Sequence, residues 1–135
     1  MKTFRLQIIA PNKLFYDGVC TMVEYNTQEG YVGVYADHIP MIQILKPGKL
    51  SIYENDNAEP KIGALHHGFV RIMQDVITIL AERVEWKEEL DLERAKESLE
   101  RAEKRLASDD ENIDKDRALK SKEKAEARIE VAKNG

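Results

Sequence analysis

The three histidines and the single cysteine are the residues whose chemistry is most readily used for metal binding or catalysis. His66 and His67 are adjacent, and adjacent side chains of a strand point to opposite faces, which argues against a chelating group with His38. Cys20 is the only cysteine, which excludes an internal disulfide bond and is typical of the reducing cytoplasm. We therefore expect ordinary structural histidines, a small buried thiol at Cys20 and no metal site.

The familiar catalytic motifs are missing from the chain. It contains no phosphate loop of the G-x-x-x-x-G-K-[ST] type, no nucleophile elbow and no pair of cysteines at metal-binding spacing. No set of residues supplies a nucleophile together with a base. The sequence therefore predicts no catalytic residues, and we do not expect the protein to be an enzyme by itself.

Composition limits the class of partner. The chain has 135 residues, of which 42% are hydrophobic and 34% charged, with a formal net charge of −4. This length suffices for one compact domain, or for one domain with an appendage. The negative charge gives no general support for binding nucleic acid or anionic lipid. No apolar run approaches the roughly 20 residues that span a bilayer, so we expect no direct membrane insertion and membrane association only through a partner.

The elements that must position any site fall into two halves. All aromatic residues lie at or before Trp86, all prolines lie at or before Pro60, and no glycine follows Gly68 until the last residue. Charged residues become denser in the second half, although the net charge barely changes. We predict two domains, residues 1–86 and residues 87–135, the second containing a linker and a helical region.

The first half has the pattern of short strands joined by turns. Phe4, Leu6 and Ile8 alternate with polar residues from the start of the chain, so we also expect neither a signal nor a transit peptide. Two pairs of runs flank polar turns and predict β-hairpins, 49–53 with 61–65 and 70–73 with 76–80. Every second residue from Val19 to Tyr25 would lie on one face of a strand, so we predict one strand through Val19, Thr21, Val23 and Tyr25. Many short strands at this spacing are typical of a β-sandwich or flattened barrel.

Two glycines are expected to interrupt the chain before Val34. Gly30 and Gly33 can adopt the positive φ angles that other residues avoid. The segment is then a tight turn, and the pattern leaves open whether it is also a docking loop. Pro40 is expected to fix the exit of the same loop.

The second half changes to a helical period. Apolar residues recur every three or four positions along a first helix, at Leu92, Ala95, Leu99, Ala102 and Leu106. Residues 107–112 carry turn and capping residues, and the seam resumes at Ala118, Ala125, Ile129 and Ala132 with Lys122 interrupting it. We predict an antiparallel two-helix hairpin over about 91–133. Its largely alanine seam buries little area, at about 25 cal/mol per Å², so we expect it to need a surface to lie on and to be mobile.

Four segments of the chain carry the motifs of one protein family, in the order and at the spacing of that family. Residues 30–41 resemble the family segment G-x-[LM]-G-[IV]-x-x-x-H-x-P-[LM], and residues 67–72 its S-G-G-x-x-x-V strand. Residues 76–81 are similar to its V-T-[IV]-L-A strand, and residues 90–95 to the [IL]-D-x-x-R-A start of its helical hairpin. By these motifs the chain resembles the bacterial F-type ATP synthase epsilon subunit family, and the resemblance covers the whole chain. It implies an α+β protein, with an antiparallel β-sandwich of about ten strands followed by the hairpin.

The resemblance also implies a role and partners. The protein would be a non-catalytic rotor-stalk subunit of the proton-translocating synthase, peripheral at the cytoplasmic face of the bacterial cell membrane. The sandwich would clamp the gamma subunit and rest on the membrane ring of c subunits, with Tyr31, His38 and Pro40 nearest the ring. The hairpin would fold against the sandwich, or extend into the catalytic alpha and beta subunits and inhibit ATP hydrolysis. The alternative is a free-standing cytoplasmic nucleotide-sensing or adaptor module.

The chain departs from the family pattern at three positions. Asp37 and His67 each stand where many relatives have glycine. Tyr31 likewise stands where many relatives have an acidic residue.

Basic residues gather on the second helix, at Arg117, Lys120, Lys122 and Lys124. They suit acidic loops of a catalytic subunit, although they also balance nearby acidic residues.

The resemblance finally implies that ATP, with or without Mg²⁺, is a regulatory ligand and that no cofactor is obligatory. The site residues it implies are Glu85, Leu90, Asp91, Arg94, Ala95, Arg101, Lys124 and Arg128. Helical geometry is compatible with this set, because Arg94 and Arg101 are seven apart and an antiparallel hairpin brings Arg94 opposite Arg128. The alternative is that Arg94 pairs with Asp91 or Glu97, and Arg128 with a glutamate of the second helix.

Overall fold

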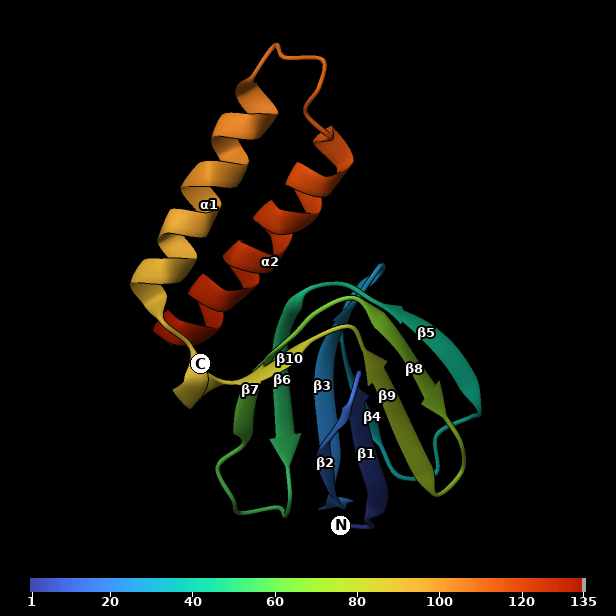
Figure 1. The fold of residues 1–135 in the computed structure, drawn as a ribbon. Helices are drawn as coiled ribbons and strands as arrows, with labels where there is room; N and C mark the ends of the chain where they lie inside the picture. The colour runs from blue at the N-terminus through green and yellow to red at the C-terminus, as the bar shows by residue number, and fades with distance from the viewer. Residues whose placement is uncertain (135) are drawn as a thin grey trace.

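The computed structural model describes residues 1–134, which form a β-domain followed by two helices (Figure 1). The described residues contain ten strands in one sheet. They are β1 (Phe4–Ala10), β2 (Lys13–Cys20), β3 (Met22–Thr27), β4 (Gly30–Tyr35), β5 (Met41–Leu45), β6 (Gly48–Tyr53), β7 (Lys61–Leu65), β8 (Gly68–Ile72), β9 (Val76–Ala81) and β10 (Val84–Trp86). A short 3₁₀ turn, η1 (Lys87–Glu89), leads to α1 (Leu92–Ala107) and α2 (Lys115–Asn134).

The sheet follows the strand order β10-β7-β6-β3-β5-β8-β9-β1-β2, with β4 paired to β3. Both predicted hairpins are confirmed, since β6 pairs with β7 and β8 with β9 in antiparallel register. The pairing of β1 with β9 is parallel, with Arg5 opposite Val76. The sheet curls over on itself to enclose a core (Figure 1). The predicted β-sandwich of about ten strands followed by a helical hairpin is confirmed, with this one parallel pair as an addition.

Two local predictions about the strands are wrong. Gly33 does not break the chain but lies inside β4, where a Cβ would come within 3.2 Å of the sulfur of Met22. Of these two glycines, Gly30 alone has a positive φ, of 109°, where the tight turn enters the strand. The predicted strand through Val19 is likewise two strands, because the chain turns at Thr21, and this leaves Val19 outside while Tyr25 is buried.

Large apolar side chains fill the sandwich. Leu6 and Ile8 of β1 are fully buried, and so are Leu50 of β6 and Ile79 of β9, on elements far apart in the sequence. Each such side chain contributes about 1.5–3 kcal/mol by leaving water. The hydroxyl of the buried Tyr25 donates to the side-chain oxygen of Gln43 at 2.5 Å, so its polar end is satisfied. The core therefore lies within the β-domain and does not depend on the helices.

Both ends of α1 are capped. The Asp91 carboxylate accepts a hydrogen bond from the backbone N–H of Arg94 at 3.2 Å, which is an N-cap contact. At the other end the Lys115 ammonium donates to the carbonyl oxygens of Arg105 at 2.7 Å and Leu106 at 3.0 Å, and also to that of Ser108. A lysine from the start of α2 thus donates to carbonyl groups at the end of α1, where the Arg105 carbonyl also accepts from the backbone N–H of Ser108.

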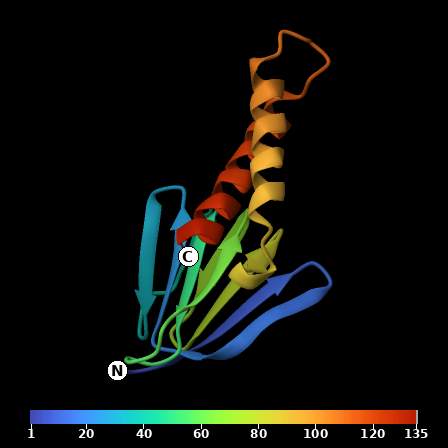
Figure 2. The same ribbon diagram turned by 90° about the vertical axis from the view of Figure 1, so that its left-hand side faces the viewer.

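The second helix is buried on two sides. Ala118 and Ala125 are buried, as their predicted seam toward α1 requires, but Ala127 and Val131 are buried as well. The reason is that the part of α2 near its carboxyl end packs on β6 and β7 in addition to α1. Figure 2 shows this end of the hairpin resting at the edge of the sandwich while its tip projects away.

Candidate functional site

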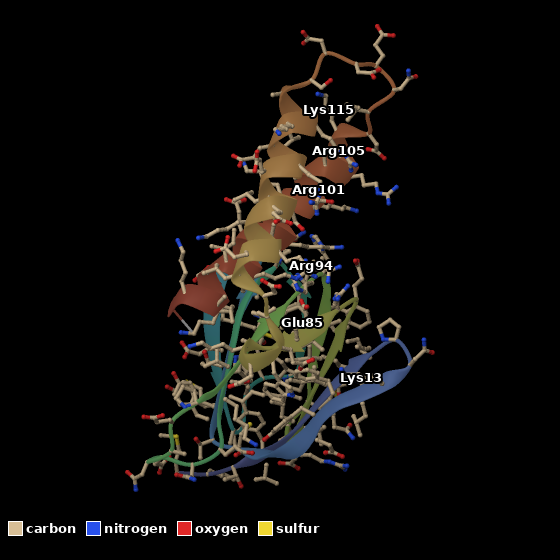
Figure 3. All side chains as sticks on the ribbon, turned by 60° about the vertical axis from the view of Figure 1, so that its left-hand side comes forward. Lys13, Glu85, Arg94, Arg101, Arg105 and Lys115 are labelled. Atoms are coloured by element: carbon tan, nitrogen blue, oxygen red, sulfur yellow. The ribbon has the colours of Figure 1, made fainter. Side chains whose placement is uncertain are left out.

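A polar cleft of about 330 Å³ lies where β10, the start of α1 and α2 meet. Figure 3 shows Glu85 below Arg94 at the foot of the hairpin, with Arg101 further along α1. The residues lining the cleft are Arg83, Glu85, Glu89, Leu90, Asp91, Arg94, Ala95, Ser98, Arg101 and Arg128. Four arginines and three carboxylates therefore share one concavity between the two parts of the molecule.

Glu85 is the central carboxylate of this cleft. Its Oε1 lies 3.0 Å from His66 Nε2 and accepts a hydrogen bond from Arg128 Nε at 2.8 Å. Its other oxygen lies 3.7 Å from Arg83 Nη2. Burial alone would raise the pKa of Glu85, but the hydrogen bonds from His66 and Arg128 lower that pKa to about 2. Glu85 therefore carries a negative charge that links the sheet to α2.

A second ion pair reinforces this link. Lys124 Nζ lies 2.5 Å from Glu82 Oε1, between α2 and the turn that follows β9. The hydrogen bond from Lys124 lowers the pKa of Glu82. The predicted placement of Lys124 in the same site as Arg94 is not what the structure has, because this pairing holds Lys124 outside the residues that line the cleft.

Arg94 and Arg101 remain available to a ligand. Both are exposed, and within residues 1–134 neither guanidinium lies within ion-pair distance of a carboxylate. Arg101 Nη2 donates to the hydroxyl of Ser98 at 3.1 Å. Arg94 is therefore not paired with Asp91 or Glu97 in this structure. Arg128 pairs with Glu85 of β10, so the alternative of a glutamate on the second helix is wrong.

Seven of the eight residues implied for the nucleotide site line this one cleft. They are Glu85, Leu90, Asp91, Arg94, Ala95, Arg101 and Arg128. Sequence reasoning missed Ser98, which helical spacing from Arg94 and Arg101 puts on their face. It also missed His66, for which the local pattern has no signal because only the fold brings it to Glu85.

The three residues implied for the rotor ring do not form one patch. Tyr31 lies at the start of β4, where its hydroxyl accepts from the backbone N–H of Lys49 at 2.9 Å. Its pKa is raised by burial and, more weakly, by the charge of Glu130 on α2. His38 and Pro40 lie beyond the other end of β4, in the segment that leads to β5. Tyr31 is thus beside the hairpin, with the length of a strand between it and the other two.

Comparisons with known proteins agree with this architecture. Residues 3–87 match the family described as "ATP synthase, Delta/Epsilon chain, beta-sandwich domain", and residues 88–133 match its "long alpha-helix domain". The ATP synthase epsilon chain of Shouchella clausii is 37% identical over 134 residues, covering 99% of this chain and 98% of that one. The epsilon chain of Alkaliphilus oremlandii is 39% identical over 106 residues, covering 78% of each chain.

Solved structures show the same fold. A chain in the Euglena gracilis mitochondrial ATP synthase, in a structure of OSCP, F1 and c-ring, superposes with a TM-score of 0.82 at 23% identity, covering 93% of this chain and 78% of that one. One from the central stalk and c-ring of the Tetrahymena thermophila enzyme gives 0.63 at 16% identity, covering 96% of both chains. With two matching domains and full-length relatives, this chain belongs to the family of F-type ATP synthase epsilon subunits. Among residues 1–134, neither helix has the length and apolar character that crossing a bilayer requires.

Proposed function

We propose that this chain is a non-catalytic central-stalk subunit whose hairpin, when docked, is held by ATP and, when released, inhibits ATP hydrolysis. The observation that carries the proposal is the cleft at the foot of the hairpin, in which unpaired arginines of α1 face the Glu85–Arg128 pair. Its place is peripheral, at the cytoplasmic face of the bacterial cell membrane. Its partners are the gamma subunit, the ring of c subunits and, for the released hairpin, the catalytic alpha and beta subunits.

The cleft suits a nucleotide triphosphate. Arg94 and Arg101 offer planar donor groups that suit phosphate oxygens, and Arg94 lies in the first turn of α1. Asp91 caps that turn and presents a second carboxylate oxygen to a hydroxyl or amine. Glu85 and Arg128 close the opposite wall. A ligand that touches both walls binds the docked hairpin better than the released one, and this difference in affinity is what shifts the equilibrium.

We propose that gamma docks on the outer face of β5 and β8. Ile42, Ile44 and Phe69 are 67%, 53% and 44% exposed, and Ile44 lies directly opposite Phe69 across the strand pair. Beside them is a hollow of about 480 Å³ whose lining includes Ile9 and Leu80. A contiguous apolar surface of this kind favours a permanent protein partner. It lies away from β6 and β7, so a docked hairpin leaves it open.

The proposed inhibitory surface is the face of α2 that is turned toward the sandwich when the hairpin is docked, together with the basic residues beside it. Release of α2 frees Lys124 and Arg128 from their carboxylate partners and adds them to the exposed Arg117 and Lys120. A released α2 therefore exposes more unpaired positive charges than a docked one, and it is better suited to acidic loops of a catalytic subunit. Deleting residues 91–135 should leave assembly intact and raise ATPase activity at low nucleotide concentration. An unchanged rate would remove the inhibitory role.

Calorimetry on the isolated chain tests the nucleotide site. The wild type should bind Mg-ATP, and Arg94→Ala should weaken binding by at least about tenfold, or about 1.4 kcal/mol. Arg105→Ala is the matched control, because Arg105 is exposed on the same helix and lies outside the lining of the cleft. If the wild type gives no heat at millimolar ATP, the nucleotide site is absent. If both variants lose the same affinity, the effect comes from the overall positive charge and not from this cleft.

A further inference from the structure

His66 lies where the sandwich meets the hairpin, behind the wall of the cleft. It follows β7, its side chain is fully buried, and its backbone N–H donates to the carbonyl oxygen of Arg83 at 3.0 Å. Its Nε2 lies 3.0 Å from Glu85 Oε1, the oxygen that also accepts from Arg128 Nε at 2.8 Å. One carboxylate oxygen therefore joins a buried imidazole of the sheet to a guanidinium of α2.

The charged groups around His66 divide into those that stay with the sandwich and those that move with the hairpin. The sandwich contributes Glu82, Arg83, Glu85 and the neighbouring His67. The hairpin contributes Lys124 and Arg128, each paired with one of these carboxylates. When α2 leaves, the positive charges of Lys124 and Arg128 leave the surroundings of His66, while two carboxylates and the guanidinium of Arg83 remain.

The docked hairpin keeps His66 neutral. Burial is the main cause that lowers the pKa of His66, and the charges of Arg128 and Lys124 lower it further, against the raising effect of the Glu85 carboxylate. Neutral His66 then donates from Nε2 to Glu85. Its buried Nδ1 has no hydrogen-bond partner within the described chain, so a second proton would gain no partner there.

We propose that protonation of His66 competes with docking of the hairpin, so that acidification releases α2 from the sheet. In the released state Glu85 has lost Arg128, and it becomes the counter-ion of a charged His66. The carboxylate thus exchanges one cationic partner on the hairpin for another within the sandwich. This inference shares with the proposed function only the premise that the hairpin leaves the sheet, and it needs no nucleotide.

The direction of the pH effect follows from linkage. The pKa of His66 is lowered in the docked state and rises on release, when the covering helix and its two cations are gone. The released state therefore binds more protons, and docking strengthens as pH rises. Docking weakens as pH falls through the pKa of the released state. Between the two pKa values the docking constant should change about tenfold for each pH unit.

NMR on the full chain without nucleotide, between about pH 5 and pH 8, tests this inference. The His66 imidazole resonances report its protonation, and the amide resonances of β6 and β7, the strands under α2, report docking. Both should change with one midpoint, the docked form being lost on the acid side. A His66 that titrates while the β6 and β7 amides stay constant would overturn the proposal.

Paired variants separate His66 from the other titrating groups. His66→Gln cannot take up the proton but retains an amide donor for Glu85, so docking should persist at neutral pH and lose its pH dependence. His67→Gln, the matched control one residue along, should keep the wild-type dependence. A His66→Gln chain that is released by acid as the wild type is would refute the inference. Calorimetry with Mg-ATP at fixed pH is a separate measurement, so the nucleotide site can fail while this result stands.

Discussion

The sandwich core and the docking face of the hairpin are held together by different interactions. The core consists of large aliphatic side chains such as Leu6 and Ile79, from which water is fully excluded. The docking face of α2 buries the small side chains of Ala127 and Val131, next to two ion pairs. A buried leucine contributes about 1.5–3 kcal/mol and a single methylene about 0.8 kcal/mol. The sandwich core therefore rests on much more buried apolar area than docking does, and the proposed reversal of docking by a ligand or a proton leaves that core intact.

The largest effect is expected in the core. Leu6→Ala removes a fully buried side chain from β1 and should cost about 2–5 kcal/mol of the free energy of unfolding, through lost burial and a cavity. Urea unfolding followed by circular dichroism measures it. Leu14→Ala is the matched control, because Leu14 is 58% exposed and should change the free energy by less than about 0.5 kcal/mol. Equal losses would contradict a core confined to the sandwich interior.

The next effect is expected at the Glu85 junction. Glu85→Gln keeps the shape but removes the charge shared by His66 and Arg128, so docking should weaken by about 1–3 kcal/mol. Hydrogen exchange of the α2 amides should accelerate while β8 and β9 remain protected. Glu88→Gln, an exposed change two residues from the end of β10, is the control and should leave exchange as it is. Faster exchange in β8 and β9 would mean that Glu85 supports the sandwich instead.

The same carboxylate gives docking a second, more acidic limit. The pKa of Glu85 is about 2 in the docked state, below its ordinary value of 4.5. A lowered pKa stabilises the docked state above the ordinary value, and this contribution is lost as pH falls from about 4.5 toward 2. In His66→Gln, hydrogen exchange of α2 should therefore still accelerate below about pH 4.5. Constant protection of α2 down to pH 3 would contradict the role of Glu85.

A smaller effect is expected at the outer ion pair. Lys124→Met removes the partner of Glu82, which is 56% exposed, so docking should weaken by only about 0.2–1 kcal/mol. Added salt should weaken docking in the wild type more than in the variant, because the exposed pair is screened. Hydrogen exchange of α2 at low and high salt measures both. A loss as large as that of Glu85→Gln would mean that the two pairs are equivalent.

The smallest effect on stability is expected at the two ends of β4. Tyr31→Asp and His38→Ala change exposed or half-exposed residues on either side of the strand. Because these residues are a strand apart, we expect only one of the two variants to impair coupling of ATP hydrolysis to proton pumping in membranes. The impaired variant identifies the end that faces the ring. If neither alters coupling or ring binding, both residues leave the proposed interface.

Periodicity within an element predicted most of the fold. The alternation of Leu6 and Ile8, and the seam through Ala95 and Ala102, were enough to predict a buried strand and a helical seam. The arginines of α1 follow from helical spacing, which is why most of the implied site falls in one cleft. These features need only the local geometry of a strand or a helix.

Features that depend on contacts between elements were not predictable. Ala127 and Val131 are buried because α2 packs on the sheet. Lys124 lies outside the lining of the cleft because it pairs with Glu82. The surroundings of His66 are formed by three separate segments, which are the end of β7, β10 and α2. Alternation likewise tells which face of a strand is buried but not which strand lies beside it, and so the neighbour of β1 was not predicted.

The parallel pairing of β1 with β9 also constrains the order in which the sheet can form during synthesis. As the chain is synthesised, β1 can form its hairpin with β2 at once, but its other edge has no partner until β9 has emerged. Pairing so distant along the chain is slow, and the sheet stays open during that interval. The helical hairpin is translated after all ten strands, so the sandwich can close before α2 docks on it. Docking of the helical hairpin is therefore separable from folding of the sandwich, and loss of docking would leave the sandwich folded.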